Sequence, residues 1–421
     1  MRLFPIAVLL ALFAVPVFGA GEDTDDDGDG WTENQGDCCD VVASCPQPAL
    51  VNPGAFEVPG NGVDDNCNGT IDEPREVCDA GLASNDSDPL SYAKAMDLCE
   101  GVISAQFVLP DGTGTPSSLS RAIRALHGAV VPQFATSFLV LSTGRAAAPG
   151  QTNPAFAEFE PGTPLGTTSA LPADWLAANG NRVPVPSGCP EIFTGTASDG
   201  IMLQLQVRVP TNARSFRVAT RFLTSEYPEW VCSNYVDPFV ILLDSAFAGS
   251  PANPHDKNVA AHIKSDGQIV VTSTSLVAAN TSLFRSCKNG STGCSGMSPG
   301  TYSQCTGTSD LAGTGFDGLS AEGSCGENNL VGGGTGWLST TGNVVPGETI
   351  ELRFAIWDTA DGFNDSLVLI DGFTWEVDNG TPGTVIAGDR KEGPLSDSLG
   401  LYLILRTSPL TPLREFCCPC H

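Results

Sequence analysis

The central part of the chain alternates apolar and polar residues with a period of two, which predicts strands that bury one face each. The alternation covers residues 203–209, 216–222 and 350–356. Two denser apolar runs, 239–243 and 367–370, are typical of strands that are covered on both faces. Because little helical pattern separates these strands, the sequence predicts a mainly β fold, an antiparallel β-sandwich or jelly roll, rather than a parallel α/β sheet.

Two short helices are predicted before the strands. Asp88 and Pro89 form a favourable helix start, and apolar side chains follow at helical spacing: Tyr92, Ala95, Met96 and Cys99. A second stripe lies within residues 118–126 and ends before Gly128. We therefore expect helices after Asp88 and over residues 118–126.

The sequence divides into four regions. Residues 1–20 have the charged start, apolar stretch and small residues of a secretory signal peptide; the alternative of a membrane anchor is disfavoured because the apolar stretch is short and acids follow it. An Asp- and Cys-rich module is expected over 21–79, a β-sandwich body over 80–377 with a Cys-rich insertion at 282–336, and an unstructured tail over 378–421. No later segment is long enough to span a bilayer, so the prediction is a protein that is secreted or on the outer cell surface.

Charge excludes one class of function. The 421 residues include 48 acidic and 20 basic side chains, a formal net charge of −28. Such a chain is unsuited to nucleic acid, whose phosphates need clustered Lys and Arg. More than half of this charge lies in residues 21–79, which carry sixteen acids and one base.

Fifteen cysteines in an exported chain predict disulfides. Six lie within residues 38–99, six within 189–325, and three within 417–420. Because the total is odd, at least one cysteine is free or pairs between chains. The sequence leaves the connectivity open.

The acidic module carries two half-motifs of the EF-hand calcium loop. The first places Asp25, Asp27 and Asp29 before Gly30, and the second runs from Asp64 to Asp72 with a glycine at the matching position. Neither has the glutamate of loop position twelve. Oxygen ligands favour a hard cation, so we expect Ca²⁺ as the cofactor; the alternative is a solvated acidic linker. The predicted metal ligands are Asp25, Asp27, Asp29, Asp37, Asp64, Asn66, Asn68 and Asp72.

In its order of motifs this segment resembles a metal-binding module of bacterial surface and secreted proteins, many of them from myxobacteria. The similar stretches are 25–30, 36–38, 53–57, 62–69 and 71–73. The chain departs from that module at Pro59, where other copies carry a cysteine, and at residues 39–45, which look inserted. The module is related to a segment of a copper-associated protein, but nothing here supplies the His or Met that copper prefers.

The body resembles a second family, the choice-of-anchor L domain of bacterial surface proteins. The resemblance rests on residues 139–144, 222–239, 352–358 and 365–373, taken in that order. It implies an exported β-rich domain and no established chemistry.

Acidic and aromatic residues gather in one predicted connection, residues 224–237. As an exposed loop it would offer a surface for a cell-surface glycan or a surface protein, through Glu226, Tyr227, Glu229, Trp230, Tyr235 and Asp237. The alternative is a loop that folds back over the end of the sandwich, with Trp230 buried and Cys232 holding it. Acids and one Asn at strand ends could form one calcium site on the sandwich or cap turns, and turn capping is the commoner role. They are Glu226, Glu229, Asp237, Asp358, Asp361, Asn364, Asp365 and Asp371.

Signals for catalysis are weak. The four histidines form no H-E-x-x-H pair, and the chain has no G-x-S-x-G elbow or phosphate loop. The sequence therefore favours a secreted or surface calcium-binding protein with a noncatalytic binding or adhesion role. The alternatives are a secreted polysaccharide hydrolase and a purely structural envelope component.

Overall fold

The structure is a computed structural model that describes residues 23–42, 45, 47–192, 195–295, 298–318, 325 and 332–387. The expected signal peptide lies outside the described residues, as do Cys417, Cys418, Cys420 and most of the expected tail.

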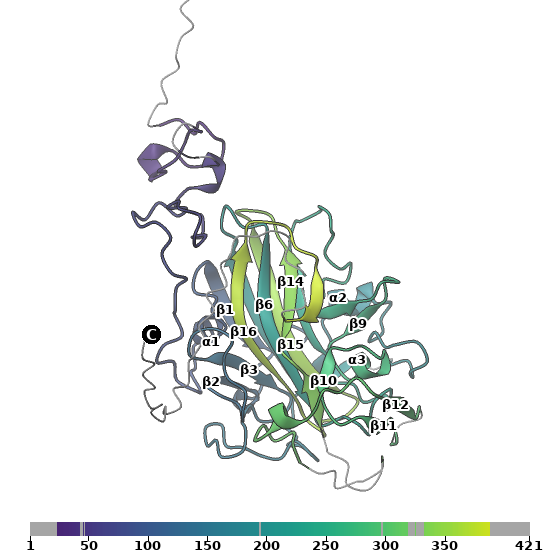
Figure 1. Cartoon of the computed structure of the whole chain (residues 1–421). Helices are drawn as coiled ribbons and strands as arrows, with labels where there is room; N and C mark the ends of the chain where they lie inside the picture. Colours follow the sequence, from purple (N-terminus) through teal and green to yellow (C-terminus); the bar gives the residue numbers. More distant parts are fainter. Residues whose placement is uncertain are drawn as a thin grey trace, which may run out of the picture.

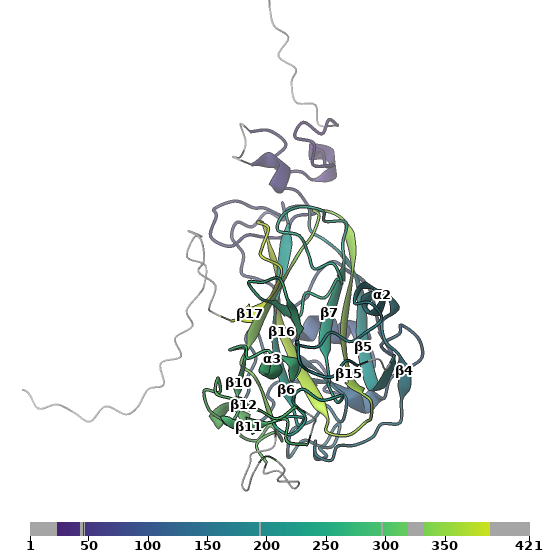
Figure 2. The ribbon, with the colours of Figure 1, turned by 90° about the vertical axis from the view of Figure 1, so that its right-hand side faces the viewer.

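Two antiparallel sheets pack face to face and form the body (Figures 1 and 2). The first sheet has the order β1-β5-β15-β7, with β4 beside β5: β1 (Val102–Val108), β4 (Thr168–Ala170), β5 (Thr196–Arg208), β7 (Phe239–Asp244) and β15 (Thr349–Thr359). The second sheet has the order β10-β13-β6-β16-β3-β2: β2 (Arg121–Arg124), β3 (Phe138–Ser142), β6 (Ser215–Thr224), β10 (Phe284–Ser286), β13 (Gly333–Thr335) and β16 (Ser366–Glu376). In addition, β14 (Leu338–Asn343) pairs with both β6 and β17 (Gly383–Ile386). The expected mainly β, antiparallel sandwich is confirmed.

Smaller elements surround the sandwich. Two hairpins are formed by β8 (Ala261–Ile263) with β9 (Ile269–Val271) and by β11 (Gly290–Thr292) with β12 (Gly300–Tyr302). The helices are α1 (Pro89–Ala95), α2 (Ala173–Ala178) and α3 (Ser275–Ala278). Single 3₁₀ turns are η1 (Glu33–Gln35), η2 (Pro48–Leu50), η3 (Ser118–Ser120) and η4 (Ser309–Leu311).

The dense apolar run in β7 is covered on both faces, as predicted. Phe239, Ile241 and Leu243 join the core between the two sheets. Val240 and Leu242 point the other way, into a second cluster on the outer face of the first sheet. The same division holds for β16, where alternate residues join the central core and a third cluster on the outer face of the second sheet.

Strand β15 buries more than the single face that its alternation predicts. Its inward residues lie in the central core, but Ala355 and Trp357 are also fully buried, on the outer face. Helix α2 covers them there, with the rings of Trp175 and Trp357 packed edge to face at 5.5 Å. A covering helix that lies far away in sequence thus decides the burial of this face.

One predicted helix is confirmed and the other is wrong. Asp88 caps α1 by accepting a hydrogen bond from the Leu90 N–H at 3.0 Å, and Tyr92 and Ala95 are buried. Residues 118–126 instead form the single turn η3 followed by strand β2, which pairs with β3. A short apolar run is ambiguous between helix and strand, and here the neighbouring strand β3 offered a partner.

The sheet also extends past the expected end of the body. Strand β17 (Gly383–Ile386) lies within the segment expected to be an unstructured tail, yet it pairs with β14 in antiparallel register. Four residues are too short for a periodic signal, so the pairing depends on the exposed edge that β14 presents.

All twelve cysteines from Cys38 to Cys325 are paired, so the disulfide prediction is confirmed. The six bonds are Cys38–Cys67, Cys39–Cys45, Cys78–Cys99, Cys189–Cys232, Cys287–Cys305 and Cys294–Cys325. Two of these bonds, Cys287–Cys305 and Cys294–Cys325, lie within the expected insertion at 282–336, which also contains β10 and β13 of the second sheet.

Within the described residues, no helix combines the length and the apolar character needed to cross a membrane.

Candidate metal site

The first acidic loop has the turn of a calcium loop. The Asp25 carboxylate accepts hydrogen bonds from the N–H groups of Gly28 at 2.6 Å and Gly30 at 3.0 Å. Gly30 has a φ of 97°, which is the left-handed region where glycine is favoured. The D-x-D-x-D-G pattern therefore folds locally as the sequence predicts.

Carboxylates converge beside this turn in two overlapping groups. Ligand oxygens of Asp25, Asp27 and Asp29 lie within 4.8 Å of one another, and so do those of Asp27, Asp37 and Asp40. The second group is the more buried, with Asp37 5% and Asp40 3% exposed. Asp27 belongs to both groups and is the centre of the site.

The second group also has oxygens that no protein atom satisfies. One oxygen each of Asp27, Asp37 and Asp40 is buried without a hydrogen bond. Their other oxygens accept from backbone: Asp40 from the N–H groups of Asp26 and Asp27, and Asp37 from that of Cys39 at 2.8 Å. Since a buried unpaired polar atom is costly, three such oxygens in one place fit a cation.

Electrostatics favour the same conclusion. Burial, and then the neighbouring Asp29, Asp37 and Asp40, raise the pKa of Asp27 to about 6. Burial and nearby acids also raise the pKa of Asp29 and of Asp37. A bound cation would favour the ionised carboxylates and remove this repulsion.

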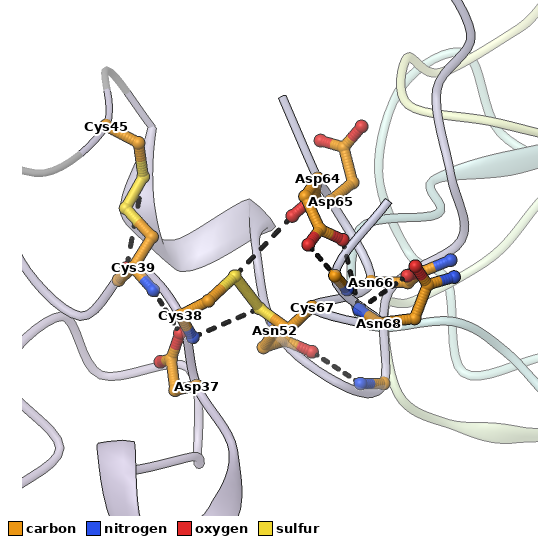
Figure 3. Close-up of a disulfide and its surroundings, with 12 residues drawn as sticks. Asp37, Cys38, Cys39, Cys45, Asn52, Asp64, Asp65, Asn66, Cys67 and Asn68 are labelled. Carbon is orange, nitrogen blue, oxygen red and sulfur yellow. Dashed lines mark hydrogen bonds between the residues drawn. A yellow bond between two sulfur atoms is a disulfide. The ribbon is translucent and has the colours of Figure 1, made fainter. Parts of the chain in front are cut away.

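The second loop, drawn in Figure 3, is ordered by hydrogen bonds of its own. Asp64 accepts from the N–H groups of Asn68 at 3.0 Å and Gly69 at 2.9 Å. The side-chain amides of Asn66 and Asn68 both donate to one oxygen of Glu73. The loop thus contains three of the predicted ligands, Asp64, Asn66 and Asn68. The amides of the two asparagines are already hydrogen-bonded to Glu73.

Asp72, the fourth ligand predicted for this loop, points elsewhere. Its carboxylate accepts from the N–H groups of Gly60 at 2.7 Å and Gly62 at 3.1 Å. Among the described residues, the groups with three acidic ligands within 4.8 Å both lie in the first loop.

A disulfide joins the two loops. Cys38 lies between Asp37 and the inserted cysteine Cys39, and it pairs with Cys67 in the middle of the second loop (Figure 3). The Cys38 N–H also contacts the Cys67 sulfur at 3.1 Å. The bond holds the segment of Asp37 and Asp40 beside the second loop. The N–H groups of Asp26 and Asp27 donate to Asp40 and hold the same segment beside the first loop.

Asp40 is the residue that sequence reasoning missed. It lies outside the D-x-D-x-D-G pattern, in the segment that looks inserted. Its spacing of three from Asp37, across two cysteines, was the available signal. Acid pairs at this spacing are common in so acidic a module, so the signal had little weight.

An open hollow of about 440 Å³ adjoins the metal site. Asp27 and Asp40 line it together with an apolar wall that includes Val41, Pro48 and Leu50. Arg214, from the body, also lines it. The hollow therefore places carboxylates, one guanidinium and apolar surface side by side.

The connection 224–237 is largely buried rather than an exposed loop. Glu226, Tyr227, Glu229 and Asp237 are each 4% exposed or less. Trp230 and Tyr235 are partly exposed and pack edge to face at 4.8 Å. The disulfide Cys189–Cys232 holds the segment against the body. These four side chains are therefore not available to a partner at the surface, because the segment folds over the end of the sandwich.

Comparisons with known protein families match two segments of the chain. Residues 135–375 match the model of the choice-of-anchor L domain. Residues 48–73 match a family described as "Putative metal-binding motif". That second match covers the second loop and begins after the carboxylate cluster of the first. No curated protein and no solved structure shows significant similarity to the chain.

Proposed function

The chain belongs to the choice-of-anchor L domain family, whose model matches more than half of its length, and we propose that it is an exported, noncatalytic adhesion protein whose N-terminal module binds Ca²⁺. The family and the metal-binding motif indicate a cell-surface protein. Calcium and adhesion are the additional steps proposed here.

The observation that carries the metal proposal is the set of three buried, unpaired oxygens on Asp27, Asp37 and Asp40. Asp25 and Asp29, whose oxygens are partly used by backbone N–H groups, would complete the shell from the exposed side. Folding alone leaves this group of carboxylates repelling one another. Binding of a cation would stabilise the module as well as fill the site.

The donor set selects the kind of metal. All five carboxylates offer oxygen, which suits Ca²⁺, Mg²⁺ or Mn²⁺ rather than copper. The nearby cysteines Cys38, Cys39, Cys45 and Cys67 are in disulfides and offer no thiolate. Ca²⁺ tolerates the irregular arrangement of two half-loops, whereas Mg²⁺ demands near-octahedral geometry.

The hollow beside the site supports a binding role. A ligand in the hollow would contact the cation held by Asp27 and Asp40. It would also contact Arg214 and the apolar wall. An acidic surface glycan or an acidic segment of a surface protein has the matching chemistry. The partner would then bind in a calcium-dependent way.

Calorimetry on the disulfide-bonded full chain tests the metal proposal. We expect Asp37→Asn to weaken Ca²⁺ binding at least about tenfold, roughly 1.4 kcal/mol, because it removes a charge while Asn can still accept the Cys39 N–H. Asp72→Asn is the matched control, since Asp72 caps a separate turn, and it should leave the affinity nearly unchanged. Absence of calcium-dependent heat in the wild type would refute the proposal.

A glycan array, probed with and without calcium, tests the adhesion role. Binding that requires calcium, releases no product and weakens in Arg214→Ala would support it. Release of shortened saccharides would instead indicate the hydrolase alternative.

A further inference from the structure

Three deeply buried aspartates lie at one end of the sandwich, far from the N-terminal module in sequence. Asp358 is near the end of β15, Asp365 directly precedes β16, and Asp237 precedes β7. They are 1%, 1% and 2% exposed, respectively. Strands of both sheets therefore contribute to the group.

The alternation of β15 directs Asp358 inward. Ile350, Leu352, Phe354 and Ile356 all belong to the core between the sheets, and Asp358 continues that series. The register with β5 shifts by one residue at this point, where Asp199 and Gly200 face Trp357. The bulge thus lies on β5, and the inward direction of Asp358 is kept.

Protein atoms satisfy these three carboxylates only in part. Both oxygens of Asp358 are buried without a hydrogen bond, as is one oxygen of Asp365. The other Asp365 oxygen accepts from the Thr163 N–H at 3.1 Å, and Asp237 accepts from the Ser366 hydroxyl at 2.6 Å. Turn capping does not explain Asp358, because a capping carboxylate accepts hydrogen bonds from backbone N–H groups and both oxygens of Asp358 lack them.

No basic side chain balances the group. Burial, and then the charges of Asp237, Asp365 and Asp199, raise the pKa of Asp358 well above its usual value. None of the ion pairs in the described part of the chain includes any of the three. An uncompensated buried charge is costly, so the charge must be neutralised.

Bare backbone surrounds the Asp365 carboxylate. A Cβ placed on Gly144 would lie 1.8 Å from one carboxylate oxygen, and a Cβ on Gly162 would lie 2.7 Å from the other. Side chains at these two positions would displace the carboxylate. The glycines therefore keep a narrow space for Asp365 beside unpaired oxygens.

We propose that Asp358 and Asp365, assisted by Asp237, bind a second calcium ion inside the body. A neutral oxygen is at hand, since the Thr143 side chain lies beside the Asp358 carboxyl. In the described chain, three acidic ligands within 4.8 Å of one another occur in the module alone. The ion would consequently draw Asp358 and Asp365 together, linking β15 of one sheet to β16 of the other.

Counting bound calcium tests the proposal without requiring a fragile variant. The disulfide-bonded full chain is stripped with chelator, dialysed against Ca²⁺ and analysed by mass spectrometry of the metal. The triple variant Asp27→Asn, Asp37→Asn, Asp40→Asn removes the module's cluster and should still retain one calcium per chain. Its melting temperature should also rise with calcium concentration. A triple variant that binds no calcium and melts at a calcium-independent temperature would show that protons neutralise the aspartates, and would overturn the proposal.

Adding Asp358→Asn to that triple variant should abolish the remaining calcium. The matched control adds Asp371→Asn instead. Asp371 is also a fully buried acid, and it lies on β16, the strand that directly follows Asp365. Asp371 accepts from the N–H groups of Gln133, Phe134 and Gly372, so the control should retain its calcium. Retention of calcium by the Asp358→Asn protein would place the ion elsewhere and refute the assignment.

Discussion

His127 shows how burial alone can set the charge of one side chain. It is fully buried, and Nε2 lies 3.2 Å from the Thr314 carbonyl oxygen. Burial, more than the nearby arginines, lowers the pKa of His127 to about 3. In the unfolded chain the pKa is about 6.5, so the folded protein excludes a proton that the unfolded chain binds.

This difference predicts a dependence of stability on pH. Between about pH 6.5 and pH 3 the unfolded state holds one more proton at this residue, so the free energy of unfolding falls as pH falls, by up to about 1.4 kcal/mol per pH unit. His127→Gln should remove that part of the slope, which urea unfolding at several pH values measures. The exposed His255→Gln is the control and should leave the slope as in the wild type. Equal slopes for wild type and His127→Gln would contradict the prediction.

At the scale of an element, the connection 224–237 is part of the core. Tyr227 packs on Phe284 with ring centroids 5.2 Å apart, and its hydroxyl donates to the Lys288 carbonyl. Cys232 at φ 61° pairs with Cys189, which closes a loop with a sequence separation of 43. The segment therefore fixes the end of the sandwich.

Removing this disulfide should destabilise the body. In the loop-entropy account a closed loop of this length contributes about 4 kcal/mol, so Cys189→Ser with Cys232→Ser should lower the free energy of unfolding by roughly that amount, as measured in guanidinium. Cys39→Ser with Cys45→Ser, a pair confined to the acidic module, should leave the transition of the body in place. A body transition that does not shift in the first variant would show that packing alone holds the segment.

At the scale of the whole molecule, the module is fastened to a turn of the body. The Asn212 side chain makes two hydrogen bonds to the Phe56 backbone, at 3.0 and 2.8 Å. Asn52 accepts from the Thr211 hydroxyl and donates to Asp29 at 2.7 Å. Asn52 thus links Asp29 of the metal-binding loop to Thr211 of the body through two hydrogen bonds.

Breaking this contact should loosen the module without unfolding the body. Asn212→Ala removes both bonds to Phe56, and we expect small-angle scattering to show a larger maximum dimension and proteases to cut between residues 58 and 75 several-fold faster. Asn253→Ala is matched, since Asn253 also makes two bonds to backbone, at Asn343, but lies away from the module. Its cleavage rate in that region should equal the wild type's. Equal rates for the two variants would mean that Arg75 and the Cys78–Cys99 disulfide suffice to hold the module.

The sequence by itself determined the features that depend on neighbours along the chain. Alternation with period two identified β5, β6 and β15, and the unbroken apolar runs identified β7 and β16 as doubly covered. Asp88 with Pro89 identified the start of α1, and Asp25 with Gly30 identified the first calcium-type turn. These succeed because a strand face, a helix cap and a tight turn are each set within a few residues.

The tertiary structure decided which distant groups meet. Hydrogen bonds from the Asp26 and Asp27 N–H groups place Asp40 beside Asp27, whereas Asp72 lies at Gly60. Strand β3 turned residues 121–124 into a strand, and the sandwich end buried Glu226 and Asp237. Asp358 lies in the first sheet and Asp365 directly precedes a strand of the second, so their shared burial follows from the packing of the two layers. Local pattern specifies the direction of a side chain along its own strand, whereas the partner that it faces is set by contacts between segments that are not neighbours along the chain.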